Sequence, residues 1–164
     1  MHESAEKLIL LVDDNQDDLM LIGRTLERIG LRTRSLPSGK EAIAYLSRDY
    51  PYRDRAAYPV PDLVLLDIKM PGTDGFAVLR WIREQQQFSD LCVVMLTCSV
   101  EILDVDRSYQ LGANSFLVKP LEFGNPGHLW HSLQRFLAGR RKTRPAVSRS
   151  NADVWVGDGE GWTG

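Results

Sequence analysis

The chain has 164 residues, of which 43% are hydrophobic and 26% are charged, and its formal net charge is −2. This balance fits one globular domain with a tail and excludes collagen-like, mucin-like and wholly disordered chains. No apolar run reaches the roughly 18–20 residues that span a bilayer, the polar start is no secretory signal, and no overall basic field attracts nucleic acid, so we expect a cytoplasmic protein without a membrane partner.

The first two elements are predicted near the N-terminus. Residues 8–12 are apolar throughout and predict a strand covered on both faces. Residues 17–29 then carry apolar side chains at three- and four-residue spacing, which predicts a helix. Its N-cap is Asn15 or Asp17, and Gly30 ends it.

The middle of the chain repeats this order with a long interruption. Residues 31–36 alternate between apolar and polar side chains and predict an edge strand, and a second helix is expected to open at 37–38. Prolines, tyrosines and mixed charges between residues 48 and 61 predict a long loop. A buried strand follows at 62–67.

The last third contains two more pairs of elements. A turn at 71–75 is expected to lead into a third helix. Apolar runs at 91–97 and 114–120 predict strands, and the amphipathic stretches at 100–111 and 126–137 predict the helices that follow them.

The overall order is therefore a strand and a helix, repeated five times. Parallel strands need crossover connections, and these are right-handed, so the order predicts an α/β fold: a doubly wound parallel sheet with helices on both faces. At Gly139 the chain changes to a basic run (140–149) and then a Gly-rich end. We predict one domain over residues 1–138 and a disordered tail over residues 139–164.

Reactive side chains follow four of the predicted strands. In an open α/β sheet, ligands bind where the carboxyl ends of the strands meet. The residues expected there are Asp13, Asp14, Asp67, Thr97 and Lys119. Three carboxylates repel one another unless a cation lies between them, and hard oxygen ligands in this number favour Mg²⁺. A carboxylate could then accept a phosphoryl group while the metal, the lysine and the hydroxyl neutralise its charge.

Four segments carry a resemblance to a known family. Residues 12–15, 66–75, 96–98 and 118–120 read VDDN, LDIKMPGTDG, LTC and VKP. In this order and spacing they resemble the receiver domain of two-component response regulators. The resemblance implies a flavodoxin-like (βα)5 fold with strand order 2-1-3-4-5. It also implies a signalling phosphoprotein of a phosphorelay that is not an enzyme beyond its own phosphorylation and slow dephosphorylation.

The resemblance also assigns roles to single residues. Asp67 would be the phosphoacceptor, and Asp13 and Asp14 would hold Mg²⁺ together with Asp67. The backbone carbonyl of Lys69 would complete the metal ligands that the protein supplies.

Other positions would contact the phosphoryl group or respond to it. Thr97 and Lys119 would bind its oxygens, and Thr97 and Phe116 would form the conformational switch. Phe116 lacks the hydroxyl of the more frequent tyrosine, so its rotation would be driven by packing alone. Lys69 could pair with a phosphoryl oxygen or restrict attack by water. Cys98 stands where a small residue is usual and is small enough to leave access open.

The implied partner is a histidine kinase, whose phosphoryl group would change the populations of two surface conformations. By resemblance, the last helix–strand–helix region would then bind either a partner protein or a second copy in a homodimer. The loop at 48–61 and the absence of an output domain also resemble the stand-alone regulators that partner bacteriophytochrome-type histidine kinases.

Two other functions fit part of the sequence. A small aspartyl-phosphate phosphatase of the haloacid dehalogenase type has an Asp two positions after its nucleophile, where this chain has Lys69. A regulator could contact DNA through the basic run 140–149, but no recognition helix or zinc finger accompanies that run, so DNA binding is not expected. A nicotinamide- or flavin-binding module would need a Gly-x-Gly-x-x-Gly turn after the first strand, which is missing.

Overall fold

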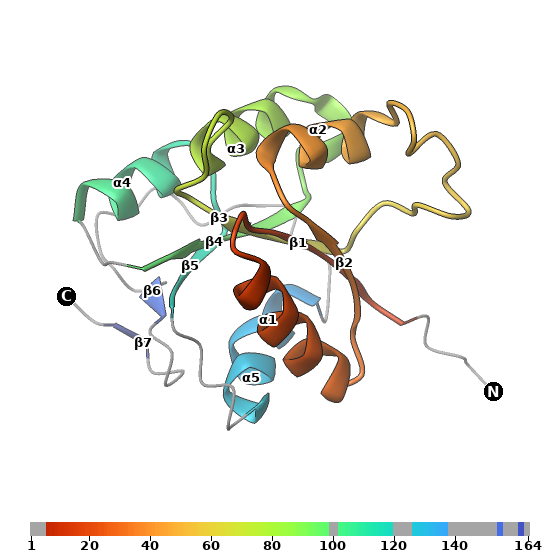
Figure 1. Cartoon of the computed structure of the whole chain (residues 1–164). Helices are drawn as coiled ribbons and strands as arrows, with labels where there is room; N and C mark the ends of the chain where they lie inside the picture. The colour runs from red at the N-terminus through yellow and green to blue at the C-terminus, as the bar shows by residue number, and fades with distance from the viewer. Residues whose placement is uncertain (1–5, 99–101, 120–125, 138–153, 156–160, 163–164) are drawn as a thin grey trace.

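A parallel sheet forms the centre of the protein (Figure 1). The computed structural model describes residues 6–98, 102–119, 126–137, 154–155 and 161–162. The five main strands are β1 (Leu8–Val12), β2 (Arg32–Leu36), β3 (Leu63–Asp67), β4 (Cys92–Thr97) and β5 (Ser115–Val118). They lie in the order β2-β1-β3-β4-β5 and are all parallel, which confirms the predicted fold class and strand order.

Helices cover both faces of this sheet. They are α1 (Gln16–Arg28), α2 (Gly39–Ser47), α3 (Gly75–Glu84), α4 (Ile102–Gln110) and α5 (Pro126–Leu137), with a short 3₁₀ turn, η1, at Gln86–Phe88. Helices α1 and α5 lie on one face, and α2, α3 and α4 lie on the other (Figure 1). No described helix has the length and apolar composition that crossing a membrane requires.

Burial explains why the central strands are apolar at every position. In β1, Ile9 and Leu11 point into the core beneath α1 and α5, whereas Leu10 and Val12 join the core beneath α2, α3 and α4. All four side chains are fully buried. Strand β2 lies at the sheet edge, and it is accordingly mostly polar, with four of its five residues at least partly exposed.

Side-chain caps determine where three helices begin. Asn15 accepts a hydrogen bond from the backbone N–H of Asp18, so Asn15, and not Asp17, is the N-cap of α1. Ser38 caps α2 and Asp74 caps α3 in the same way. Gly30 follows α1 with φ of +86°, a conformation that glycine adopts without strain.

The long loop predicted between residues 48 and 61 is tied to the body of the protein. The rings of Tyr45, Tyr52 and Tyr58 pack together, with centroids 5.1–6.0 Å apart. The guanidinium of Arg34, on β2, lies 5.1 Å from the centre of the Tyr58 ring. Arg55 donates hydrogen bonds to carbonyls at the end of α2, including that of Tyr45 at 3.1 Å. Aromatic packing and two half-buried arginines therefore hold a segment that has no regular structure of its own.

Two short strands extend the sheet beyond β5. β6 (Val154–Trp155) pairs with β5 in parallel, and β7 (Gly161–Trp162) pairs with β6 in antiparallel fashion. The apolar pattern of the sequence does not predict these two strands. The other residues of the segment 139–164 lie outside the described residues, so the domain boundary and the predicted disorder stay predictions, except that these two dipeptides are paired.

Candidate functional site

The carboxyl ends of four strands meet at one edge of the sheet. Strand register aligns Val12 with Leu66, and Asp67 with Leu96. It also aligns Thr97 with Val118, directly before Lys119. This edge contains a cavity of about 150 Å³. Its lining residues are Asp13, Asp14, Asn15, Asp18, Asp67, Lys69, Thr97, Cys98 and Lys119.

Three carboxylates gather in this cavity. Asp13 and Asp67 are buried, whereas Asp14 is exposed at the rim. One carboxylate oxygen from each lies within 4.8 Å of the others. The backbone N–H of Asn15 donates to Asp13 Oδ1 at 3.0 Å, which fixes the buried carboxylate at the end of β1. The prediction that these three residues converge is confirmed.

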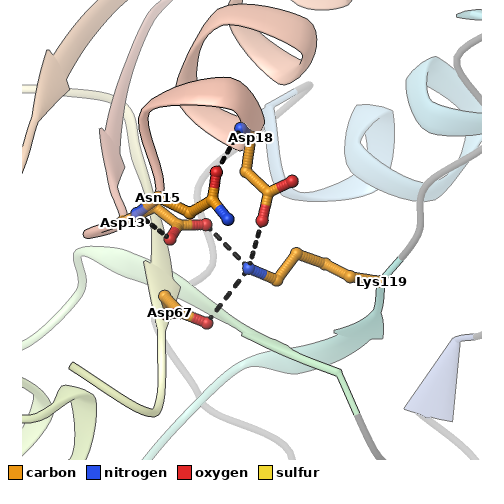
Figure 2. A network of polar contacts seen from close by, with 5 residues as sticks. All are labelled: Asp13, Asn15, Asp18, Asp67 and Lys119. Carbon is orange, nitrogen blue, oxygen red and sulfur yellow. Dashed lines mark hydrogen bonds and ion pairs between the residues drawn. The ribbon is translucent and has the colours of Figure 1, made fainter.

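The ammonium group of Lys119 lies among the carboxylates (Figure 2). Its Nζ is 2.8 Å from Asp13 Oδ2, 2.9 Å from Asp18 Oδ2 and 3.4 Å from Asp67 Oδ1. The lysine side chain is only 8% exposed. A buried ammonium in contact with three carboxylates offsets the repulsion that they exert on one another.

Burial and neighbouring charge set the protonation of the site. Burial, and after it the charge of Asp13, raises the pKa of Asp67 to about 7, although Lys119 opposes both effects. Burial alone would lower the pKa of Lys119, but hydrogen bonds to Asp13 and Asp18 and the charge of Asp67 raise it above its ordinary value. The lysine therefore stays charged at neutral pH, while Asp67 titrates there.

Gly75 lets α3 begin directly against the end of β3. Its backbone N–H donates to the carbonyl of Ile68 at 2.8 Å. A Cβ atom at this position would lie 2.2 Å from the carbonyl oxygen of Asp67 and 2.8 Å from Cα of Ile68. These distances are too short for any side chain, so only glycine permits this approach to the backbone of Asp67.

We expect Gly75→Ala to lower the free energy of unfolding by roughly 1–3 kcal/mol, because the added methyl group forces α3 away from β3. Chemical denaturation measures the change. Gly23→Ala, within α1, is the matched control, because its Cβ would lie 3.8 Å from Thr33 Oγ1, an ordinary contact. Equal stability of the two variants would contradict the close approach.

The remaining predicted site residues lie in two places. Thr97 is buried at the end of β4 and lines the cavity, as do the exposed Lys69 and Cys98. Phe116 does not line the cavity. It is fully buried in β5, in the same core cluster as Val105 of α4. Its role as a switch, and that of the Lys69 carbonyl as a ligand, stay predictions.

Asp18 is a site residue that the sequence did not predict. The predicted site residues follow the ends of the strands, whereas Asp18 belongs to the first turn of α1. The signal that could have revealed it is the N-cap at Asn15. A helix whose N-cap lies two residues after Asp13 must carry its own first turn over the same edge of the sheet.

Comparisons with known proteins agree with this geometry. The chain matches the family described as response regulator receiver domain over residues 9–127. It is 39% identical, over 118 residues, to the probable methanogenesis regulatory protein FilR2 of Methanothrix harundinacea, a match that covers 71% of this chain and 74% of FilR2.

Solved structures show the same similarity. The phosphorylated cyanobacterial phytochrome response regulator RcpA superposes with a TM-score of 0.71 at 30% identity, covering 87% of this chain and all of RcpA (100%). The bacteriophytochrome response regulator RtBRR superposes with a TM-score of 0.68 at 35% identity, covering 87% of this chain and 86% of RtBRR.

Several other curated relatives are longer proteins. The match covers 42% of the transcriptional regulatory protein GltR of Pseudomonas aeruginosa and 58% of the response regulator ARR3 of Arabidopsis thaliana. What these proteins share with this chain is the domain that the family match spans. The chain therefore belongs to the response regulator receiver domains of two-component signalling.

Proposed function

We propose that this receiver domain accepts a phosphoryl group from a histidine kinase on Asp67, with Mg²⁺, and signals through a change in its protein contacts. One observation supports this most strongly. The carboxylate of Asp67 and the ammonium of Lys119 share one small cavity with the carboxylates of Asp13 and Asp14, although more than a hundred residues of chain separate Asp13 from Lys119.

The donor atoms in the cavity fit Mg²⁺. Asp13, Asp14 and Asp67 offer three carboxylate oxygens within 4.8 Å of one another, and hard oxygen ligands are those that Mg²⁺ prefers. The backbone carbonyl of Lys69 would add a further oxygen. When bound, Mg²⁺ would supply positive charge to the oxygens of the transferred phosphoryl group.

The chain's own residues would carry out the transfer. An oxygen of the Asp67 carboxylate would attack the phosphorus of a phosphohistidine. The new O–P bond would form as the P–N bond breaks, and the histidine ring would leave with the bonding electrons and take up a proton. Lys119 and the Thr97 hydroxyl would bind the oxygens of the transferred group. The partly covered cavity would limit attack by water.

The output would be a shift between two surface conformations that involves Thr97 and Phe116. The chain is similar to RcpA and RtBRR, which are named as phytochrome response regulators, and this similarity supports a phytochrome-type kinase as the partner. The proposed readout is contact with another protein or formation of a homodimer, in the cytoplasm.

A phosphatase of the haloacid dehalogenase type is the less favoured function. The position two residues after Asp67 is occupied by Lys69, which cannot serve as the carboxylic acid that such an enzyme uses. We therefore propose no turnover of phosphate esters beyond slow self-hydrolysis. The basic run 140–149 lies outside the described residues, and contact with DNA is not part of the proposal.

Phosphotransfer tests the proposed function. The chain is incubated with Mg²⁺ and one of two donors: a phytochrome-type histidine kinase that carries a radiolabelled phosphoryl group, or a small phosphodonor. Transfer of the label from the kinase is followed, and the intact mass of the chain is measured with the small phosphodonor. One added phosphate supports the proposal. Absence of any transfer from both donors would contradict it.

Mg²⁺ should stabilise the protein more strongly as pH rises to about 7. Because the fold raises the pKa of Asp67 to about 7, the folded protein holds a proton that the unfolded chain loses near pH 4. Without metal, the contribution of Asp67 to the free energy of unfolding therefore falls between about pH 4 and 7 and then levels off. A proton on Asp67 also competes with Mg²⁺, so the apparent affinity should fall about tenfold per pH unit below 7.

Calorimetric titration and thermal unfolding check this dependence. We expect millimolar Mg²⁺ to raise the unfolding midpoint clearly at about pH 8 and much less at about pH 5.5. Equal midpoints with and without Mg²⁺ at the higher pH would contradict the metal site.

A further inference from the structure

The ammonium of Lys119 lies at unequal distances from its three carboxylate partners. Its Nζ lies within 3 Å of Asp13 (2.8 Å) and Asp18 (2.9 Å), whereas the proposed phosphoacceptor, Asp67, is its most distant carboxylate partner at 3.4 Å. Figure 2 shows the ammonium between Asp18 on one side and Asp67 on the other. The lysine thus forms its short hydrogen bonds with Asp13 and Asp18 and makes its longest contact with Asp67.

The fold places Asp18 for this contact. The backbone N–H of Asp18 donates to the Asn15 side chain at 3.1 Å, which fixes the first turn of α1 above the cavity. The Asp18 side chain is 28% exposed, so its charge is partly shielded from water. The adjacent Asp17 is exposed, and none of the described contacts of Lys119 involves it.

Asp18 competes with a phosphoryl group on Asp67 for the ammonium of Lys119. An ammonium group has three N–H donors, and Asp13 and Asp18 take two of them at short distance. A phosphoryl group arriving on Asp67 needs the same ammonium, and it also meets the negative charge of Asp18. Two like charges a few ångströms apart near a protein surface repel each other. Asp18 therefore opposes the arrival of the group that Lys119 would bind.

We propose that Asp18 is a positioning residue that holds Lys119 back from Asp67 and thereby slows phosphorylation. This rests on the proposed function of Asp67 and adds a regulatory element to it. The carboxylate at position 18 sets how readily the lysine turns toward the phosphoryl group. Its removal should make the domain easier to phosphorylate and leave the nucleophile untouched.

Asp18→Asn and Asp17→Asn form a matched pair of variants. Both lose one negative charge from the first turn of α1, but only Asp18 contacts Lys119. With acetyl phosphate and saturating Mg²⁺, we expect initial phosphorylation by Asp18→Asn to be about three- to tenfold faster than in the unmodified chain. Asp17→Asn should stay within about twofold. Asp18→Ala, which also removes the hydrogen-bond acceptor, should change the rate in the same direction as Asp18→Asn.

A second measurement needs neither metal nor phosphodonor. The ¹⁵N resonance of the Lys119 ammonium should shift in Asp18→Asn and stay in place in Asp17→Asn. Equal phosphorylation rates for the paired variants, or a slower rate for Asp18→Asn, would overturn the inference while leaving the proposed function intact. Failure of the unmodified chain to take up phosphate would overturn the proposed function and this inference together.

Discussion

Asp67→Asn should give a folded protein whose rate of phosphorylation is reduced by roughly a hundredfold or more. An amide nitrogen or oxygen is a far weaker nucleophile than a carboxylate, and Asp67 is the carboxylate that ends β3 inside the cavity. Intact mass after incubation with Mg²⁺ and a small phosphodonor measures the loss.

The same substitution should stabilise the metal-free protein. Burial and the charge of Asp13 raise the pKa of Asp67 to about 7, so at about pH 8 the folded state holds an unfavourable charge that asparagine removes. We expect a gain of about 1–3 kcal/mol in the free energy of unfolding. The gain should shrink near pH 5, where Asp67 in the folded protein is already neutral.

Asp90→Asn is the matched control for both measurements. Asp90 is exposed and precedes β4, so it lies at the opposite end of the sheet from Asp67. This variant should accept phosphate normally and keep its unfolding midpoint. Phosphate retained on Asp67→Asn would show that the acceptor is a different residue.

Lys119→Met should cause the largest loss of stability among the substitutions considered. Asp13 is fully buried, and without the ammonium it and Asp67 would face each other with no cation between them. Removing one partner of a buried ion pair typically lowers the free energy of unfolding by about 3–5 kcal/mol. Chemical denaturation in the presence of a chelator, at about pH 8, measures this loss.

Mg²⁺ should restore part of that stability, because a divalent cation can occupy the carboxylates that the lysine leaves unpaired. Lys40→Met provides the control. Lys40 is exposed on α2, so its replacement should change the free energy of unfolding by no more than about 0.5 kcal/mol. A Lys119→Met variant as stable as Lys40→Met would contradict the central position of the lysine.

The alternation of apolar runs with amphipathic stretches was sufficient to predict the sheet. Central strands are covered on both faces, so continuous apolar runs such as 8–12 had few alternative interpretations. The cavity could be predicted from the same feature, because parallel strands bring their carboxyl ends together. This is why the sequence alone predicts Asp13, Asp67 and Lys119 as neighbours.

Contacts made by side chains outside the strands could not be predicted in this way. The ion pair between Asp18 and Lys119 depends on how α1 is rotated about its axis, and a shift of one residue in the N-cap would remove it. Arg83 likewise bonds to the Asn114 side chain at 2.9 Å, although the two residues belong to different parts of the chain. Periodicity identifies elements but does not determine such side-chain geometry.

The loop between α2 and β3 combines residues that are anchored to α2 with residues that are open to substitution. Its inner residues, including Tyr52 and Arg55, are fastened to α2, whereas Tyr50 is 81% exposed and Val60 49% exposed. Substitutions in those outer residues leave β3 and Asp67 where they are. This surface can therefore change to suit a new partner while the arrangement of Asp67, Asp13 and Lys119 in the cavity stays the same.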